Sequence, residues 1–459
     1  MTRLFGTDGI RGVANIDLKP TLAYALGRAT AHRLVGPGGA ILVGQDTRRS
    51  GDMFVAAITA GATSLGVDVH RVGVVPTPAL AFLTAAGPFA AGIMVSASHN
   101  PAEDNGLKVL DHRGLKLDDA LEDELEQLIW RADELTGVPN AHLGRAIEAT
   151  SRLESYIAHR EALARRVPAA GLRIVVDCAH GAGGATAPRI LAATGAVVEV
   201  IHNEPDGSNI NAAAGAIAPE RLARVVVERG ADLGIALDGD ADRCIAVDAA
   251  GRIVDGDQVL GILALDRLGR GALPGGGLVV SVLSNGGLAA AVEAAGGHVI
   301  RTPVGDKYIL EAMLVSGAVL GGEKSGHVIV LEHTTSGDGV VTAIELLGVL
   351  ARAERPLAEL AAAIPLLPQE QRTVRVRHKE AWEGDPPLQA AIRAAQARLG
   401  PRGRILVRPS GTEPALRVMV EGEDPDLVAA LADELAELAK ARLDVEDGVR
   451  REGGDRGIH

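Results

Sequence analysis

The sequence has few aromatic residues and few cysteines. Phe, Trp and Tyr make up only 2% of its 459 residues, and they are not interleaved with lysine or arginine clusters. Together with a formal net charge of -13, this composition argues against a nucleic-acid partner, which requires basic patches. The two cysteines, Cys178 and Cys244, lie far apart and form no Cys-x-x-Cys spacing. We expect both to be buried small side chains in a reducing compartment.

Long uninterrupted apolar runs are also missing. Residues 72–102 contain no formally charged side chain at neutral pH, but Pro76, Pro78, Pro88 and Pro101 interrupt them. A membrane helix is therefore not predicted. The first residues show no apolar stretch typical of a secretory signal. We expect a cytoplasmic protein with neither a membrane nor a nucleic-acid partner.

Repeated patterns along the chain predict several domains. An apolar strand-like run, a loop of small residues and an alanine-rich helical stretch follow one another near Ala40, Arg173 and Gly277. This succession predicts three separate α/β domains. After Pro365 the pattern changes to the alternation of a half-exposed strand, which predicts a smaller α+β domain. The expected domains are residues 1–150, 151–255, 256–365 and 366–445, with 446–459 as a flexible tail.

Ser98 ends an apolar run, residues 92–101, that closes with Ser-His-Asn-Pro. The residue before a proline is pushed towards an extended conformation, so regular pairing stops here and we expect an exposed hydroxyl on a turn. In isolation this pattern is typical of a capping or turn serine. A hydrolase pair with His99 is not favoured, because neighbours on an extended chain point to opposite faces.

Alternating aspartates suggest a metal site. Asp238, Asp240 and Asp242 follow an apolar run, residues 231–237, that is typical of a buried strand. In a looping segment this spacing lets the carboxylates converge on a hard cation, and Mg²⁺ is the natural occupant. An EF-hand is excluded, because Arg243 and Ala249 stand where that loop needs glycine and glutamate. A solvated acidic turn is the alternative, although without a metal the carboxylates would repel one another.

Two further loops carry groups that suit a sugar phosphate. Residues 408–417 combine hydroxyls, a flexible glycine and guanidinium charge, as a phosphate dianion requires. This candidate phosphate cradle consists of Arg408, Ser410, Gly411, Thr412 and Arg417. Residues 321–327 offer Glu323, Ser325 and His327, a mixture that suits sugar hydroxyls, with His327 as a candidate for proton transfer. The alternative interpretations are an ordinary turn and a structural histidine.

These motifs occur in the order and at the approximate distances of one protein family. They comprise residues 5–12, 96–101, 238–243, 321–327, 333–335 with 337–339, and 408–422. Over nearly its whole length the chain resembles the α-D-phosphohexomutases. This resemblance implies four domains around a central active-site cleft: three similar α/β domains with mixed sheets, followed by a smaller α+β C-terminal domain.

The resemblance also implies a mechanism. Ser98 would carry a phosphoryl group as phosphoserine, and Asp238, Asp240 and Asp242 would hold one Mg²⁺ together with an oxygen of that phosphate. Lys108 matches the family's general acid/base, and we expect nearby positive charge to lower its pKa. The other residues assigned to catalysis are Arg11, Arg243, His99 and His327.

The substrate follows from finer resemblances. Residues 5–12 and 417–422 resemble the branch that interconverts glucosamine 6-phosphate and glucosamine 1-phosphate through glucosamine 1,6-bisphosphate, supplying UDP-N-acetylglucosamine and cell-wall precursors. Lys324 departs from this branch, which typically carries glutamine there. Sister enzymes acting on mannose or glucose phosphates, and a non-catalytic regulator that binds sugar phosphates, are the alternatives. A hexose 1,6-bisphosphate is the implied activator, and the resemblance leaves open an activating kinase and a homodimer.

Overall fold

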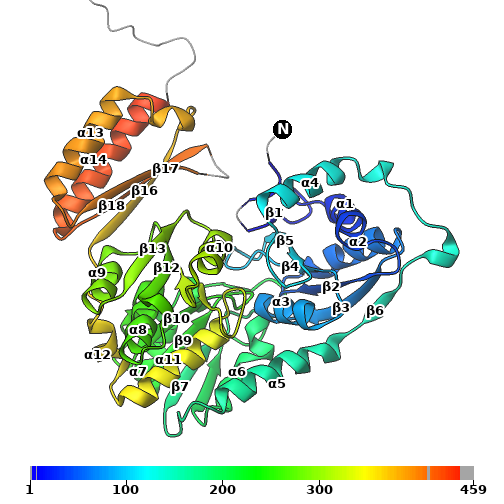
Figure 1. The fold of residues 1–459 in the computed structure, drawn as a ribbon, viewed down its shortest axis with the longest axis horizontal. Coiled ribbons are helices and arrows are strands. Elements are labelled where there is room, and N and C mark those ends of the chain that lie inside the picture. Colours follow the sequence, from blue (N-terminus) through cyan, green and yellow to red (C-terminus); the bar gives the residue numbers. More distant parts are fainter. Residues whose placement is uncertain (1–2, 7, 411–413, 445–459) are drawn as a thin grey trace, which may run out of the picture. The chain divides into compact units, whose positions relative to one another are not determined.

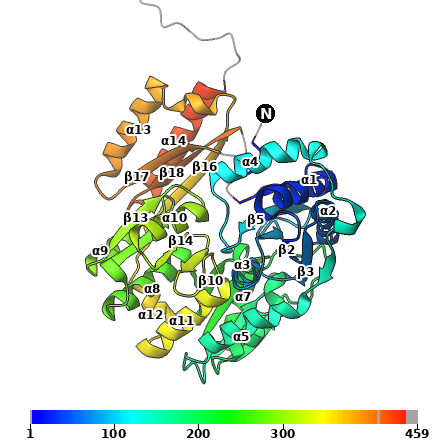
Figure 2. The same cartoon turned by 45° about the vertical axis from the view of Figure 1, so that its right-hand side comes forward.

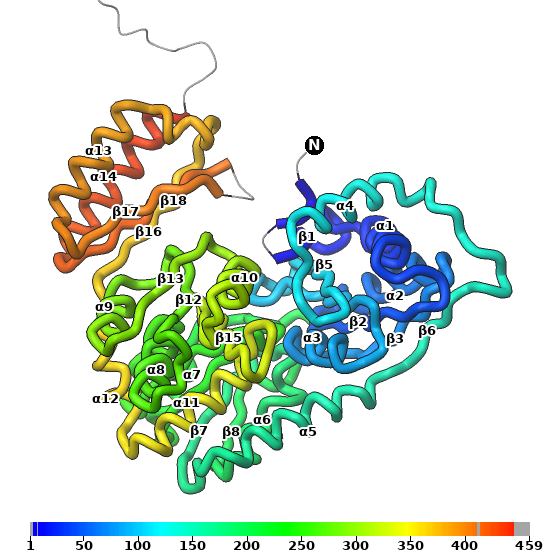
Figure 3. Tube along the Cα trace, in the orientation of Figure 1, coloured from blue at the N-terminus to red at the C-terminus, as the bar shows by residue number. Residues whose placement is uncertain are grey.

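The structure is a computed structural model that describes residues 3–6, 8–410 and 414–444. These residues form four sheets, whose succession along the chain can be followed in Figures 1 and 3. The chain divides into two compact units, one of residues 1–284 with 288–365 and the other of residues 285–287 with 366–459. Gly411, Thr412 and the tail predicted at 446–459 lie outside the described residues.

The first sheet is mixed, with strand order β1-β5-β4-β2-β3-β6. Its strands are β1 (Ile10–Val13), β2 (Ala40–Gln45), β3 (Asp68–Val74), β4 (Ala91–Val95), β5 (Asp104–Asp111) and β6 (Ala146–Glu148). Strands β2, β3, β4 and β6 are parallel, whereas β5 runs antiparallel to both β4 and β1. Because β5 returns beside β4, the connecting segment that holds Ser98 lies at one end of this sheet.

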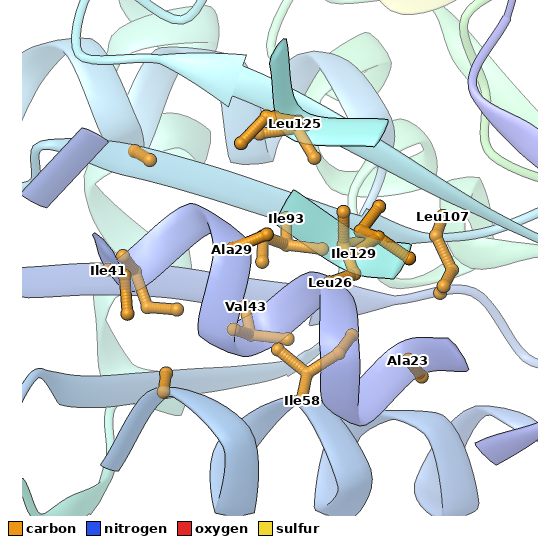
Figure 4. Close-up of a cluster of buried hydrophobic side chains, with 14 of the residues drawn as sticks. Ala23, Leu26, Ala29, Ile41, Val43, Ile58, Ile93, Leu107, Leu125 and Ile129 are labelled. Carbon is orange, nitrogen blue, oxygen red and sulfur yellow. The ribbon is translucent and has the colours of Figure 1, made fainter. Parts of the chain in front are cut away.

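Helices cover both faces of the first sheet. The helices of one face are α1 (Pro20–Thr30), α2 (Gly51–Thr63) and α4 (Asp119–Trp130). Figure 4 shows their core, in which Leu26, Ile58 and Ile129 meet apolar strand residues such as Ile93. Helix α3 (Thr77–Ala86) covers the other face, where Leu80 lies close to Gly44 of β2. The sheet is therefore buried on both sides, as its apolar parallel strands require.

The second and third sheets are also mixed, with strand orders β11-β10-β9-β7-β8 and β13-β12-β14-β15. The second consists of β7 (Arg173–Asp177), β8 (Val197–Ile201), β9 (Leu233–Leu237), β10 (Cys244–Asp248) and β11 (Ile253–Val254), with helices α6 (Ala187–Ala192) and α7 (Glu220–Arg229). The third consists of β12 (Gly277–Ser281), β13 (His298–Thr302), β14 (Leu320–Gly322) and β15 (Val328–Val330). Its associated helices are α8 (Gly256–Gly269), α9 (Gly286–Ala294), α10 (Asp306–Ser316), α11 (Gly339–Ala353) and α12 (Leu357–Ala362).

Helix α5 (Leu153–Ala164) connects the first sheet to the second (Figure 2). It packs against α3, α6 and α11, so that helices from three segments of the first unit meet along it. The side chains of its buried Tyr156 and Arg160 both donate to Asp338, at 3.0 and 3.1 Å, and Asp338 in turn caps the N-terminus of α11. Helix α5 therefore helps to fix the loop that precedes α11.

The fourth sheet is small and antiparallel, with order β16-β18-β17. Its elements are β16 (Gln369–Arg375), β17 (Arg404–Pro409), β18 (Ala415–Glu421), α13 (Pro386–Leu399) and α14 (Pro425–Leu443). Helix α14 packs on β16 and β18, and Val418, Val420 and Leu431 belong to a separate apolar core. This unit can therefore bury its own apolar face.

The predicted fold class is confirmed: α/β layers with mixed sheets are followed by a smaller α+β domain. The arrangement of four domains around a central cleft stays a prediction. Cys178 and Cys244 are buried as expected, and burial raises the pKa of the Cys244 thiol to about 12. Among the described residues, no helix combines the length and the apolar character needed to cross a membrane.

Candidate active site

Ser98 lies between β4 and β5 in a left-handed backbone conformation, with φ of 52°. Its hydroxyl Oγ donates a hydrogen bond of 2.6 Å to Asp238 Oδ2. The residue is only 1% exposed, so the expectation of an exposed hydroxyl is wrong. The loop after β9 covers the residue: Asp238 meets its hydroxyl, and Gly239 lies directly against its carbonyl oxygen. A Cβ at Gly239 would lie 2.6 Å from that oxygen, and only glycine permits this approach.

The aspartates occupy the loop that joins the antiparallel strands β9 and β10. Asp238, Asp240 and Asp242 are all buried, and one ligand atom from each lies within 4.8 Å of the others. Asp240 Oδ2 accepts hydrogen bonds from Thr77 Oγ1 at 2.6 Å and from Lys108 Nζ at 2.9 Å. In contrast, the Oδ1 atoms of Asp240 and Asp242 are buried and have no hydrogen-bond partner among the described residues.

This donor set fits a hard divalent cation. Burial and the charges of Asp242 and Asp240 raise the pKa of Asp238 well above its usual value. The pKa of Asp240 is lowered instead, because Lys108 and Thr77 outweigh the effect of its burial. Buried carboxylate oxygens without partners are costly, and a cation would satisfy them. The predicted metal-binding group is therefore present in the structure.

Lys108, on β5, points into the same cluster. Its Nζ lies 2.9 Å from Asp240 Oδ2 and 3.2 Å from Asp8 Oδ2, and the side chain is 1% exposed. Burial alone would lower its pKa, but the two carboxylates dominate and the pKa is raised. The expectation that positive charge lowers this pKa is therefore wrong, because the groups nearest the amine are negative. At neutral pH Lys108 is an ammonium ion.

Two arginines add positive charge beside the serine. Arg11 lies on β1 and donates to Asn100 Oδ1 at 3.1 Å, while Arg243 Nε lies 3.9 Å from both Asp238 Oδ2 and Asp242 Oδ1. Burial, followed by the charges of Arg243 and Arg11, lowers the pKa of His99 to about 4. These cations can therefore favour an anion at the serine loop.

His99 lies closer to the serine than expected. Its Nδ1 is 3.4 Å from Ser98 Oγ, although neighbours on an extended chain would point to opposite faces. The two side chains were wrongly predicted to point to opposite faces, because Ser98 is left-handed rather than extended. With a pKa of about 4, His99 is neutral at pH 7.

The candidate sugar-binding residues lie in the turn between β14 and β15. The Gly326 N–H donates to Glu323 O at 3.0 Å, and the Cys244 N–H donates to Gly326 O at 2.9 Å, which places the turn beside the aspartate loop. Glu323 also accepts from the Gly305 N–H at 3.3 Å. The hydroxyl of Ser325 is buried and has no hydrogen-bond partner among the described residues.

His327 follows this turn and contacts the metal-binding group. Its Nδ1 lies 3.5 Å from Asp242 Oδ2, and its Nε2 accepts a hydrogen bond of 3.0 Å from the Gly337 N–H. Nδ1 can donate to this carboxylate, and Nε2 also lies 3.4 Å from Asp306 Oδ2. Against the effect of burial, the Asp242 and Asp306 carboxylates raise the pKa of His327 to about 9. The imidazole can therefore orient Asp242.

The phosphate cradle belongs to the second unit. Arg408 of β17 and Arg417 of β18 are direct partners in the antiparallel ladder, so their side chains leave the same face of the sheet. Ser410 is buried, and its N–H donates to Ala415 O at 2.8 Å. Two guanidinium groups on one face are suited to an anion.

Several residues that shape the site escaped the sequence analysis. Arg48 and Asn211 bind the backbone around Ser98, and Thr77 binds Asp240. Asp46 directly follows β2 and Arg48 lies two residues further on, so the strand-end position that drew attention to the aspartates could have identified them. Thr77 gave no such signal, because only the fold brings the start of α3 to a loop 163 positions away.

Comparisons with known proteins agree with this geometry. Family models for phosphoglucomutase/phosphomannomutase match residues 2–136 (alpha/beta/alpha domain I), 154–251 (domain II), 255–366 (domain III) and 373–438 (the C-terminal domain). The chain therefore belongs to the phosphoglucomutase/phosphomannomutase family, within the α-D-phosphohexomutases.

Within that family the chain is similar to phosphoglucosamine mutases. It is 54% identical to the phosphoglucosamine mutase of Moorella thermoacetica, over 92% of this chain and 96% of the relative. It is 48% identical to that of Symbiobacterium thermophilum, over 96% of this chain and 100% of the relative.

Solved structures show the same fold. A phosphoglucomutase/phosphomannomutase family protein from Burkholderia thailandensis matches with a TM-score of 0.79 at 27% identity, over 96% of this chain and 99% of that one. Aspergillus fumigatus N-acetylphosphoglucosamine mutase in complex with GlcNAc-6P and magnesium matches with a TM-score of 0.68 at 21% identity, over 96% of each chain.

Proposed function

We propose that the chain is a phosphoglucosamine mutase, an isomerase that interconverts glucosamine 6-phosphate and glucosamine 1-phosphate. The main evidence is the buried Ser98 hydroxyl, whose Oγ lies 2.6 Å from Asp238 Oδ2. Asp238 is one of three aspartates that could bind a metal. Its product would feed UDP-N-acetylglucosamine and cell-wall precursor synthesis. Relatives at 48 to 54% identity support the choice of amino sugar within the family.

The proposed cofactor is one Mg²⁺. Asp238, Asp240 and Asp242 would hold it together with a phosphate oxygen on Ser98. When bound, the ion would neutralise charge on the phosphoryl group during transfer. The buried Oδ1 atoms of Asp240 and Asp242, which no described residue binds by a hydrogen bond, support this assignment.

The chain's own residues would carry out two reciprocal transfers. In the first, the bond between phosphorus and Ser98 Oγ breaks, and a bond forms to the free hydroxyl of glucosamine 6-phosphate. We assign Lys108 as the acid that protonates Ser98 Oγ and that receives the proton of the sugar hydroxyl, so that it remains an ammonium ion. Arg11 and Arg243 would neutralise the oxygens of the moving phosphoryl group.

The remaining residues would hold the reactants in place. Glucosamine 1,6-bisphosphate must turn around so that its other phosphate returns to Ser98. Glu323 and Ser325 would bind the sugar, while His99 would brace the serine loop and His327 would orient Asp242 within the catalytic set. The group proposed to hold the phosphate that is not reacting is Arg408, Ser410, Gly411, Thr412 and Arg417.

The activator and the cellular location are part of the same proposal. We propose a hexose 1,6-bisphosphate as the activator that first phosphorylates Ser98, and a cytoplasmic location. Solved relatives were determined with GlcNAc-6P and with glucose 1,6-bisphosphate, which supports sugar phosphates as ligands. An activating kinase, a homodimer and the domain limits at 150, 255, 365 and 445 stay predictions.

The test is a direct assay. The purified chain is given Mg²⁺, a hexose 1,6-bisphosphate primer and, in separate reactions, the 6-phosphates of glucosamine, glucose and mannose. The proposal predicts the highest kcat/KM for glucosamine 6-phosphate and none in the Ser98→Ala variant. A preference for glucose or mannose would assign the chain to a sister activity. No turnover of any sugar would favour a binding protein without catalysis.

A further inference from the structure

The backbone on both sides of Ser98 is held by two buried side chains that the proposed mechanism does not use. One is Arg48, which follows β2 in the first domain. The other is Asn211, from the loop between β8 and α7 in the second domain. Both donate to the carbonyl oxygens of Ser98 and Asn100.

The buried side chain of Arg48 binds the backbone of the segment that contains Ser98. Its Nη2 donates to Ser98 O at 3.0 Å and to Asn100 O at 2.8 Å, and its Nη1 donates to Asp104 O at 3.0 Å. Asp46 fixes the guanidinium through its Oδ2, 2.9 Å from Arg48 Nε, and neither side chain has any exposed surface. A planar guanidinium can satisfy several carbonyls at once, which a lysine amine cannot reproduce.

Asp46 also supports the serine through a second route. Its Oδ2 accepts from Ser96 Oγ at 2.7 Å, and Ser96 Oγ in turn accepts from the Ser98 N–H at 2.9 Å. The N–H and the carbonyl of Ser98 are therefore both tied to the Asp46–Arg48 pair. This leaves the peptide groups around Ser98 little freedom to rotate.

Asn211 holds the same carbonyls from the other side. Its Nδ2 lies 2.8 Å from Ser98 O and 3.1 Å from Asn100 O, and the residue is itself left-handed, with φ of 60°. Asparagine tolerates this conformation better than most residues. The second domain thus reaches the carbonyls of Ser98 and Asn100 with a side chain, in addition to covering Ser98 with Gly239.

We propose that Arg48 and Asn211 are positioning residues for phosphoryl transfer. This inference rests on the proposed role of Ser98 as the phosphoryl carrier. A left-handed serine is strained unless its surroundings hold it, and the direction of Oγ depends on that backbone conformation. By fixing the carbonyls of residues 98 and 100, the two side chains keep Oγ directed at the aspartates. In-line transfer is sensitive to such placement, and an error of about 1 Å can cost about a hundredfold in rate.

Asn211 offers the cleaner test, because Arg48 is buried beside Asp46 and its loss could prevent folding. Asn211→Asp keeps the size and the tolerance for a left-handed backbone but removes the amide donors. Asn211→Gly keeps the backbone freedom and removes the side chain. Asn209→Gly is the matched control, since among the described residues the Asn209 side chain binds only the backbone of its own loop, at Glu204 and Asp206. Arg48→Lys, which retains a cation beside Asp46, is the second probe.

The measurements separate positioning from folding. We expect both Asn211 variants to lower kcat by about tenfold to a hundredfold while KM changes by less than about twofold. The thermal midpoint of Asn211→Gly should match that of Asn209→Gly, whereas Asn211→Asp should lower it, because its buried carboxylate faces carbonyl oxygens. The ³¹P resonance of phosphorylated Ser98 should shift in both Asn211 variants but not in Asn209→Gly. Arg48→Lys should likewise lower kcat while KM stays nearly unchanged.

The outcome that overturns the inference is full kcat in either Asn211 variant, or a loss that Asn209→Gly shares. The wild-type chain is assayed first with each sugar phosphate. An inactive wild type would refute the proposed function, whereas an active wild type with equally active Asn211 variants would refute the positioning role alone.

Discussion

At the scale of single residues, we expect Lys324 to affect how well the proposed site suits an amino sugar. It stands between the proposed sugar-binding residues Glu323 and Ser325, where the glucosamine branch resembled by this sequence typically has glutamine. A cation here would repel the ammonium group of glucosamine by about 1 kcal/mol at a distance of about 4 Å in water.

We therefore expect Lys324→Gln to raise kcat/KM for glucosamine 6-phosphate about fivefold relative to glucose 6-phosphate. Parallel steady-state assays of the two substrates measure this ratio. Lys440→Gln, on the exposed face of α14, is the control and should leave the ratio unchanged. A ratio that moves towards glucose would contradict the argument.

His99 gives a prediction that depends on pH. Its pKa of about 4 lies below the ordinary value of 6.5, so as pH falls the unfolded chain takes up the proton first. The neutral ring therefore stabilises the fold above pH 6.5, and this contribution, at most about 3 kcal/mol, is lost as pH falls towards 4. An NMR titration of the unphosphorylated chain, with His99→Gln to assign the signal, should give a midpoint near 4. A midpoint near 6.5 would show that burial and the two arginines do not act on the ring.

The candidate functional residues were predicted from sequence more reliably than their burial and their pKa values. Ser98 and the aspartates were found from local spacing, because a serine at a strand end and alternating carboxylates are short-range signals. The burial of Ser98 and the raised pKa of Lys108 were missed. Both depend on groups more than 100 positions away, Gly239 for the serine and Asp240 for the lysine.

At the scale of elements, helices α1 and α2 of the first domain approach each other closely. A Cβ on Gly61 would lie 2.2 Å from Tyr24 O, and one on Gly27 would lie 2.4 Å from Ile58 O. Each glycine therefore lets the facing helix backbone come close. This contact lies within the core that supports β2 and β4, the strands that precede Arg48 and Ser98.

Gly61→Ala should accordingly destabilise the chain by about 1 to 3 kcal/mol, because the helices must move apart. Gly269→Ala is a matched helical control, since the added carbon would meet no described atom within 4 Å beyond its chain neighbours and its own helix backbone. It should be neutral or stabilising by up to about 1 kcal/mol. Unfolding in urea, followed by circular dichroism, compares the two. Equal effects would mean that α1 and α2 pack loosely.

The strand, loop and helix successions were readable from sequence because periodicity and small-residue loops are local. The strand order could not be predicted, because no local pattern in the sequence shows that β5 pairs antiparallel with β4. That pairing brings Lys108 to the aspartates. The mixed character of the sheets came from the family resemblance alone.

At the scale of the whole molecule, the metal-binding group joins separate domains. Asp240 is contributed by the second sheet, yet it binds Thr77 and Lys108 of the first. Without a cation, repulsion among the carboxylates weakens this junction. A ligand that binds only the folded state stabilises it by about 2.7 kcal/mol at a concentration of one hundred times its Kd.

Mg²⁺ should therefore raise the thermal midpoint of the wild-type chain. In chelator, Asp242→Asn should unfold at a higher temperature than the wild type, because one buried negative charge is gone, but it should gain less from Mg²⁺. Glu437→Gln, exposed on α14, should behave as the wild type. Differential scanning calorimetry gives all midpoints, and an equal gain in the Asp242 variant would place the metal elsewhere.

The burial of Ser98 restricts how the chain can become active. A protein kinase must bring the target hydroxyl and its flanking backbone into its own cleft, and here that would require Arg48, Asn211 and Gly239 to release the serine loop. A small sugar bisphosphate needs no such unfolding, because it enters as the reaction intermediate does. The enzyme would then be restarted by its own intermediate. A dephosphorylated preparation should show a lag in product formation that shortens as bisphosphate is added.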